Sequence, residues 1–172
     1  MHTPAKIAKH PIHPMLVAIP IGLWIFSLVC DIVYRFGGGN PNWELVALYT
    51  MIGGIVGALL AAVPGFIDML SLPRPVKRIA LIHMAINLTV VALYAVNAWL
   101  RRDGVPDSAI WLSFIGVGLL AVSGWLGGHM VYVHGVAVEP ERLDELDAGY
   151  RGRERRGRAS NAAYYGPERR VA

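Results

Sequence analysis

Four apolar segments, each about as long as a membrane-spanning helix, constrain this chain more than any other feature. They cover residues 15–34, 43–66, 79–100 and 109–132. A helix needs roughly 20 apolar residues to cross a bilayer. Short connections rich in Gly, Pro, Asn and Arg, such as GGGNPN, SLPRPVK and RRDGVPDS, separate the segments. The sequence therefore predicts an all-α fold, a transmembrane four-helix bundle.

The charged residues are few and unevenly placed. Only 16% of the residues are charged, against about 25% in soluble domains. Of the 28 charged residues, 15 follow Val138 and 13 precede it. We therefore expect a four-span membrane domain over residues 1–138 and a basic, largely disordered cytoplasmic tail over 139–172. The spans exclude a soluble enzyme, and Cys30, the single cysteine, excludes an internal disulfide and a cysteine-ligated cluster.

Basic residues near the spans predict the orientation in the membrane. Short connections force the helices to alternate in direction, so both termini lie on one side. Lys and Arg near the spans concentrate on the cytoplasmic side of a membrane protein. The side that holds the termini carries Lys6, Lys9, Arg74, Lys77 and Arg78. We therefore expect a multi-pass protein of the inner, cytoplasmic membrane with both termini in the cytoplasm.

The ionisable residues of the spans are predicted to gather at that same end. Alternating directions bring together His10, His13, Asp68, His83, His129 and His134. The opposite end has no histidine, and its polar residues are Asp31, Asn97 and the loop charges. Ionisable groups are costly in a bilayer and mark functional sites there. The shared location of the histidines is the main functional signal in the sequence.

Small residues and prolines predict how the helices pack. Rows of small residues spaced by four let helix backbones approach closely. Such rows are Gly53, Gly57, Ala61 and Gly65 in the second span, and Gly124 and Gly128 in the fourth. Pro20 and Pro64 lie inside spans, where each removes a backbone donor and frees a carbonyl that a neighbour must satisfy.

Four stretches together resemble one known family. They are HPIHPMLVAIPIGLW at 10–24, GGIVGALLAAVPGFID at 53–68, HMAINL at 83–88 and SGWLGGHMVYVHGVAV at 123–138. In this order, on successive spans, they resemble the bacterial four-helix membrane family catalogued as domain of unknown function 2231. The resemblance covers about residues 8–138. It implies an inner-membrane four-helix bundle similar in layout to small b-type cytochromes, and some members are joined to Rieske iron–sulfur domains. Where this chain has His129, the family often has an acidic residue, which favours His134 as the functional histidine of the fourth helix.

A b-type haem electron-transfer subunit is the first functional hypothesis. Haem iron takes axial histidines from facing helices, and helix bundles commonly hold it. His83 with His13 or His134 would form the axial pair, with His10 nearby. Glycines of the fourth span would leave room for the macrocycle, and basic residues would pair with its propionates: Gly124, Gly127 and Gly128, and Arg74, Lys77 and Arg78.

Two alternatives stay open. The first is a transition metal ion or proton site without haem, with ligands from His10, His13, His83, His134 and Asp68, since imidazole and carboxylate suit such ions. The second is a structural membrane subunit with no cofactor. In that case His10 and His13 merely precede a helix with Pro14 in its first turn, and His83 only bonds a neighbouring helix. We expect a redox or structural subunit rather than a stand-alone enzyme.

The predicted partners are the lipid bilayer and a redox protein, such as a Rieske-type or other electron carrier. Residues 148–172 hold seven arginines and two glutamates, which favours contact with anionic lipid. The motif RGRERRGR also occurs in nucleic-acid-binding tails, but we expect no nucleic-acid partner for a membrane protein. The sequence leaves a homo-oligomer open.

Overall fold

The computed structural model describes residues 3–8, 10–104, 106, 108–138, 148–154 and 156. In chain order the elements are β1 (Lys6–Ile7), β2 (His10–Pro11), α1 (Ile12–Leu16), α2 (Ala18–Phe36), α3 (Pro41–Leu70), α4 (Arg74–Leu100), the 3-10 turn η1 (Arg101–Asp103) and α5 (Ser108–Tyr132). The four spans, with α1 and α2 counted as one, are long and apolar enough to cross a membrane. The predicted all-α four-helix fold is confirmed.

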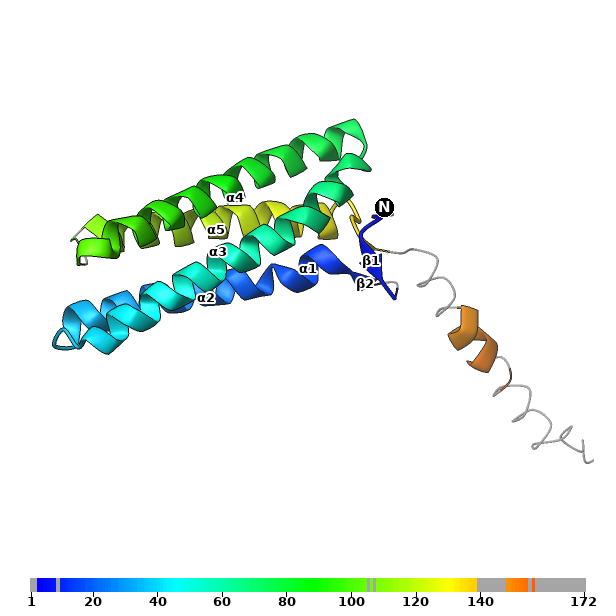
Figure 1. Ribbon diagram of the computed structural model, residues 1–172. Helices are drawn as coiled ribbons and strands as arrows, with labels where there is room; N and C mark the ends of the chain where they lie inside the picture. Colours follow the sequence, from blue (N-terminus) through cyan, green and yellow to red (C-terminus); the bar gives the residue numbers. More distant parts are fainter. Residues whose placement is uncertain are drawn as a thin grey trace, which may run out of the picture. The chain divides into compact units, whose positions relative to one another are not determined.

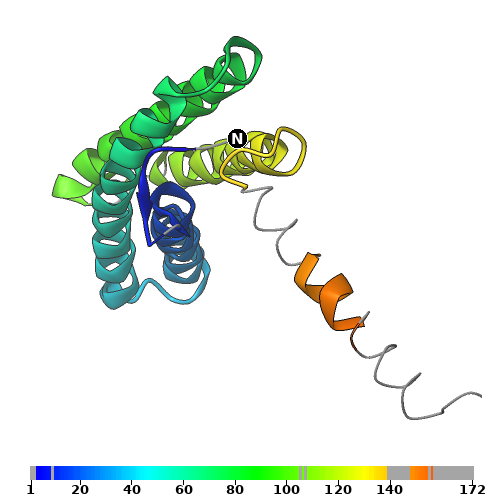
Figure 2. The same ribbon diagram turned by 90° about the vertical axis from the view of Figure 1, so that its right-hand side faces the viewer.

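The four long helices pack as a closed ring of neighbours. Helix α2 packs on α3, α3 on α4, α4 on α5, and α5 back on α2. Successive helices run in opposite directions, so the start of α1, the α3–α4 connection and the end of α5 lie at one end (Figure 1). We call this the histidine end, and the end that holds the α2–α3 and α4–α5 connections the far end. Figure 2 views the bundle along its length from the histidine end.

The first span is interrupted between α1 and α2, shortly before Pro20. Helix α1 ends at Leu16 and α2 begins at Ala18, close after Pro14 and shortly before Pro20. Pro20 has no amide hydrogen, and its ring clashes with the carbonyl of the residue four positions earlier, Leu16. The short β1–β2 hairpin precedes α1, with Lys6 opposite Pro11. The hairpin was not predicted from the sequence.

Helix α3 has a defined start and continues through its proline. The Asn40 side chain accepts a hydrogen bond from the backbone amide of Asn42 (3.0 Å), and Pro41 occupies the first helical position. Both residue types are favoured there. Pro64 lies within the helix, so the carbonyl of Leu60 has no amide donor at position 64.

An aromatic stack fills the middle of the bundle. Trp24 of α2 and Tyr94 of α4 lie parallel, with ring centroids 4.5 Å apart, and are 2% and 1% exposed. The Trp24 indole donates to the carbonyl of Met51 (3.1 Å). A Cβ at Gly116 would lie 2.7 Å from the Tyr94 ring, so the glycine makes space for the stack. This layer separates the polar groups of the two ends.

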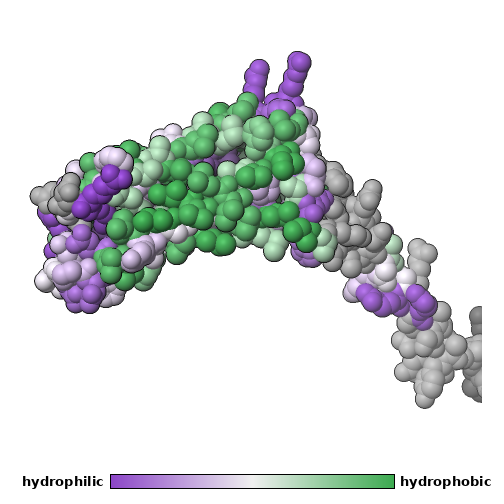
Figure 3. All heavy atoms as spheres, viewed as in Figure 1, coloured by the Kyte–Doolittle hydropathy of each residue, from purple (hydrophilic) through white to green (hydrophobic). Residues whose placement is uncertain are grey.

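The outer surface of the bundle is apolar between polar ends, as Figure 3 shows for one face. Large aliphatic and aromatic side chains point outward along every long helix, for example Val29, Leu60, Leu88 and Trp111. An exposed apolar surface of this extent is unfavourable in water and suits a bilayer. The free Cys30 is buried, as a small packing residue would be.

The predicted row of small residues on the second span does face the first span. A Cβ at Gly53 would lie 3.2 Å from the Leu23 side chain, and one at Gly57 would lie 3.2 Å from Ile19. The prediction for the fourth span was wrong. A Cβ at Gly124 meets nothing within 4 Å, and one at Gly128 meets only Tyr132 of the same helix.

The physical reason is the rotation of α5 about its axis. Its buried positions recur every three or four residues over most of the helix, at Ala109, Ser113, Gly116, Leu120, Ser123 and Met130. This stripe passes beside Gly124 and Gly128 rather than through them. The close helix contacts of α5 are therefore made at other glycines, which include Gly116 and Gly127.

The C-terminal region forms a separate unit from Val138 onward. Residues 148–154 are helical, within the tail that was predicted to be largely disordered. In this segment Arg156 donates from Nε to the carbonyl of Gly152 (3.3 Å), one helical turn earlier. The helical turns expected between Glu139 and Leu146 lie outside the described residues.

Candidate functional site: two polar layers at opposite ends of the bundle

His13 is fixed by the proline-containing turn of α3. Its Nδ1 lies 2.8 Å from the carbonyl oxygen of Ala61. A carbonyl can only accept, so Nδ1 carries a hydrogen, and in the neutral ring Nε2 then keeps a free lone pair. Ala61 is one residue beyond Leu60, whose carbonyl Pro64 leaves without a donor. The ring lies directly over Gly65, where a Cβ would be 2.6 Å from Nδ1.

His83 is held by α5 in a similar way. Its Nδ1 lies 2.9 Å from both the carbonyl oxygen and the hydroxyl of Ser123. Asn87, one turn further along α4, donates to the His83 carbonyl (2.8 Å) and to the Ser123 hydroxyl (2.7 Å). A Cβ at Gly127 would lie 3.4 Å from the ring. The space that this glycine provides is therefore taken by the imidazole.

These contacts bring the His13 and His83 rings close together from two different helices. Their ring centroids lie 6.4 Å apart, and the ring planes are nearly perpendicular, at 85°. Nδ1 of His13 points to a backbone carbonyl of α3, and Nδ1 of His83 points to a backbone carbonyl of α5. Of the axial pairs expected from the sequence, the structure thus brings together His13 and His83.

His134 lies elsewhere, beside His129. These two rings have centroids 5.0 Å apart, with planes at 81°, and both residues are half-buried at the end of α5. His10 is exposed, and its Nδ1 lies 2.8 Å from the carbonyl of Ala8 within the hairpin. Asp68 is buried and accepts from the backbone amide of Ala5 (2.8 Å), which ties the N-terminal segment to the end of α3.

The described residues contain no group of three or more His, Cys, Asp or Glu side chains placed to hold a metal ion. A metal ion held by His10, His13, His83, His134 and Asp68 stays a prediction.

A second polar layer, at the far end, was not predicted from the sequence. Arg101 forms a two-pronged ion pair with Asp31, in which NH1 and NH2 each donate to one carboxylate oxygen at 2.7 Å. Its Nε donates to Asn97 (3.0 Å). Asn97 in turn donates to the hydroxyl of Ser113 (2.9 Å), which donates to Asp31 (3.2 Å). Both charged residues are 5% exposed, so this closed network ties α2, α4 and α5 together inside the protein.

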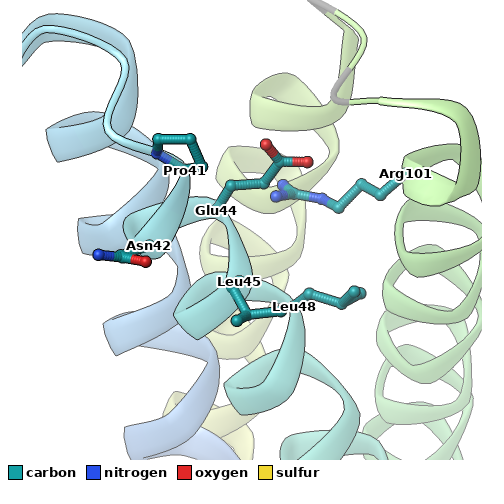
Figure 4. A pocket seen from close by; sticks show the side chains of 6 residues that line it. All are labelled: Pro41, Asn42, Glu44, Leu45, Leu48 and Arg101. Atoms are coloured by element: carbon teal, nitrogen blue, oxygen red, sulfur yellow. The ribbon is translucent and has the colours of Figure 1, made fainter.

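A small pocket adjoins this network. It has a volume of about 270 Å³ and is lined by Pro41, Asn42, Glu44, Leu45, Leu48 and Arg101. Figure 4 shows the Glu44 carboxylate and the Arg101 guanidinium side by side at the pocket, with the two leucines below them. The pocket lies far from the histidines, because Arg101 follows His83 by 18 residues of helix, about 27 Å.

The sequence did contain a signal for this network. Asp31 is the one acidic residue within its apolar segment, and Arg101 follows directly on another segment. Alternating helix directions place both residues at the same depth. Arg101 was expected to be one of the loop charges, but it is buried because its long side chain turns back toward Asp31.

The replacement Gly65→Ala tests the position of His13. A Cβ there would lie 2.6 Å from the imidazole, so we expect a loss of about 1–3 kcal/mol in unfolding free energy. Gly124→Ala is the matched control, since a Cβ at that position meets nothing within 4 Å and alanine favours a helix by about 1 kcal/mol over glycine. Denaturant unfolding in detergent micelles measures both. Equal stability of the two variants would contradict the described position of His13.

The fold, its apolar surface and its buried polar layers define a membrane protein with four candidate spans. The sequence profile of the family described as "Predicted membrane protein (DUF2231)" matches residues 9–140. The chain therefore belongs to this family, as the resemblance had indicated. Searches of curated proteins and of solved structures found no match.

Proposed function

We propose that this protein binds one b-type haem through His13 and His83 and serves as an electron-transfer subunit of the membrane. The observation that supports the proposal is the pair of facing imidazoles with ring centroids 6.4 Å apart. When bound, haem supplies a one-electron redox couple. The residues of this chain hold the haem, orient it and balance its charge.

The spacing of the two rings suits ligands on opposite sides of one metal. A ring nitrogen that binds a transition metal lies about 2 Å from it, so the ring centre lies about 3 Å away. Two imidazoles on opposite sides of the metal therefore have centres about 6 Å apart. The distance between their rings would therefore allow His13 and His83 to hold one haem iron between them.

The hydrogen bonds of the two rings also suit ligation. Histidines that bind metals almost always donate their other ring N–H to a carbonyl or carboxylate, which fixes the ring and increases its basicity. Nδ1 of His13 faces Ala61 and Nδ1 of His83 faces Ser123. The Nε2 atoms are then the ones free to bind, and Asn87 and Ser123 act as positioning residues.

The number of facing ligands favours haem over a bare ion. Haem iron needs only two protein ligands, while structural zinc takes four and catalytic zinc three. The other ligands predicted from the sequence have partners of their own. Asp68 accepts from Ala5, and His10 is turned toward Ala8.

The histidine end also offers cations for the haem propionates. Arg74 and Arg78 belong to the first turns of α4 at that end, and Lys77 donates to the carbonyl of Leu70 (3.1 Å). We propose that this end faces the cytoplasm, in agreement with the positive-inside rule, and that a soluble or membrane-bound electron carrier reaches it from that side. The lipid bilayer surrounds the rest of the bundle.

An absorption spectrum of the purified protein tests the proposal. Protein produced with a haem supply should show a Soret band and, after reduction by dithionite, the sharp α band of low-spin haem with two histidine ligands. The pyridine haemochrome assay should give one haem per chain. Protein with no Soret band in either redox state, before or after reconstitution with haem, would overturn the haem proposal.

A further inference from the structure

The pair His129 and His134 forms a second cluster of metal-ligating side chains, apart from the proposed haem ligands. The two imidazoles contact each other with centroids 5.0 Å apart. Across the described part of the chain, neither ring has a hydrogen bond at its nitrogens. His10, His13 and His83 each have one. The pair is half-buried, so part of these two residues is accessible from water.

The backbone holds the two rings together. His129 lies in the last turn of α5, and His134 follows just after the helix. The amide of Gly135 donates to the carbonyl of Val131 (3.1 Å), and the amide of Val136 donates to that of Met130 (3.0 Å). Gly135 has a φ of 64°, the left-handed conformation that glycine favours at a helix end. Val136 then packs on the cluster that contains Met130, so the two residues that follow His134 are anchored.

From this geometry we infer that His129 and His134 together chelate one divalent transition metal ion, such as Zn²⁺, at the end of α5. Ring centres about 3 Å from a common ion lie about 5 Å apart when the two ligands subtend a tetrahedral angle. The separation of this pair, 5.0 Å, fits that arrangement, whereas the 6.4 Å of His13 and His83 fits opposed ligands. Imidazole suits zinc, copper and nickel, and water completes the coordination.

This site is independent of the proposed haem ligands, because the two pairs share no residue. His129 lies in the last turn of α5 and His134 just after it, while His13 and His83 come from α1 and α4. Loss of metal binding at the end of α5 therefore tests the new site alone, and the absorption spectrum tests the haem ligands alone.

The experiment is a calorimetric titration of the full-length protein in detergent with Zn²⁺. The protein carries a tag without histidines and the replacement His2→Ala, since a terminal amine with a neighbouring histidine chelates metals by itself. One equivalent of Zn²⁺ should bind. His129→Ala and His134→Ala should each weaken binding at least about tenfold. His134→Phe, which keeps a ring in contact with His129 but has no ligand nitrogen, should weaken it equally.

The matched controls are His10→Ala, an exposed histidine outside the pair, and His83→Ala, which removes a proposed haem ligand. Both should bind Zn²⁺ as the parent protein does. The inference is overturned if the parent protein binds no Zn²⁺, if His134→Phe binds it with unchanged affinity, or if His83→Ala removes the binding that His129→Ala leaves intact.

Discussion

The variant His83→Ala is expected to lose its haem, with at least about a tenfold fall in the ratio of Soret to protein absorbance. Its imidazole is one of the two proposed haem ligands, and the second, His13, has its ring centroid 6.4 Å away. If haem is bound as proposed, this replacement would remove one of its two protein ligands, and alanine leaves the space beside Gly127 that the imidazole occupies. His13→Ala should have an effect of similar size, because His13 is the other proposed ligand.

Two controls separate loss of a ligand from loss of the fold. His10→Ala should keep the full spectrum, since that ring is exposed and bonded only to Ala8. Free imidazole added to His83→Ala should restore low-spin haem that stays with the protein through gel filtration, because imidazole can occupy the vacated space; an unfolded variant would not retain the haem. A His83→Ala protein with the unchanged spectrum would refute the assignment, and so would loss of haem in His134→Ala with haem retained in His13→Ala.

The grouping of His13 and His83 at one end followed from sequence alone. Because the apolar segments alternate in direction, the position of a residue within its segment fixes its depth in the membrane. His13 and His83 have similar predicted depths, so both were expected at the same end of the bundle. What the sequence left open was which histidines face each other, because both His13 and His134 were acceptable partners for His83. That choice depends on how each helix is rotated about its axis.

Rotation is poorly encoded in a membrane helix because the lipid-facing side is as apolar as the buried side. In α5, Ser113 and Ser123 are buried while Phe114 and Val122 are exposed, so hydrophobicity does not mark the inner face. The incorrect expectation for Gly124 and Gly128 has this origin. On α3 the same reasoning succeeded, since the row that includes Gly53 and Gly57 coincides with the contact to the first span.

The far-end network was missed for a related reason. A basic residue directly after an apolar segment resembles a charge that marks the membrane boundary, and Arg102 does behave in this way, with its guanidinium 3.5 Å over the Trp99 ring. Arg101, its neighbour, points inward instead. Asn97, four residues earlier near the end of α4, accepts from its Nε and so helps to direct the side chain toward Asp31.

Replacing Asp31 with asparagine is expected to be the most destabilising single change at the far end, with a loss of about 3–5 kcal/mol in unfolding free energy. The guanidinium of Arg101 is 1% exposed in the ion pair, so without the Asp31 carboxylate its charge stays buried without its ion-pair partner. Ser113 loses a charged acceptor at the same time. Unfolding by sodium dodecyl sulfate in mixed micelles, followed by circular dichroism, measures the change.

Two further variants show whether the cost comes from the unpaired charge or from the ion pair itself. Arg102→Gln removes a neighbouring positive charge that is exposed, so it should cost no more than about 1 kcal/mol. The double replacement Asp31→Leu with Arg101→Met removes both charges and should be more stable than Asp31→Asn, because no charge is left buried alone. If Asp31→Asn costs less than Arg102→Gln, the buried ion pair does not contribute to holding α2 against α4. The double variant could instead be the least stable of the three. In that case, the attraction between Asp31 and Arg101 contributes more to stability than the burial of an unpaired guanidinium costs.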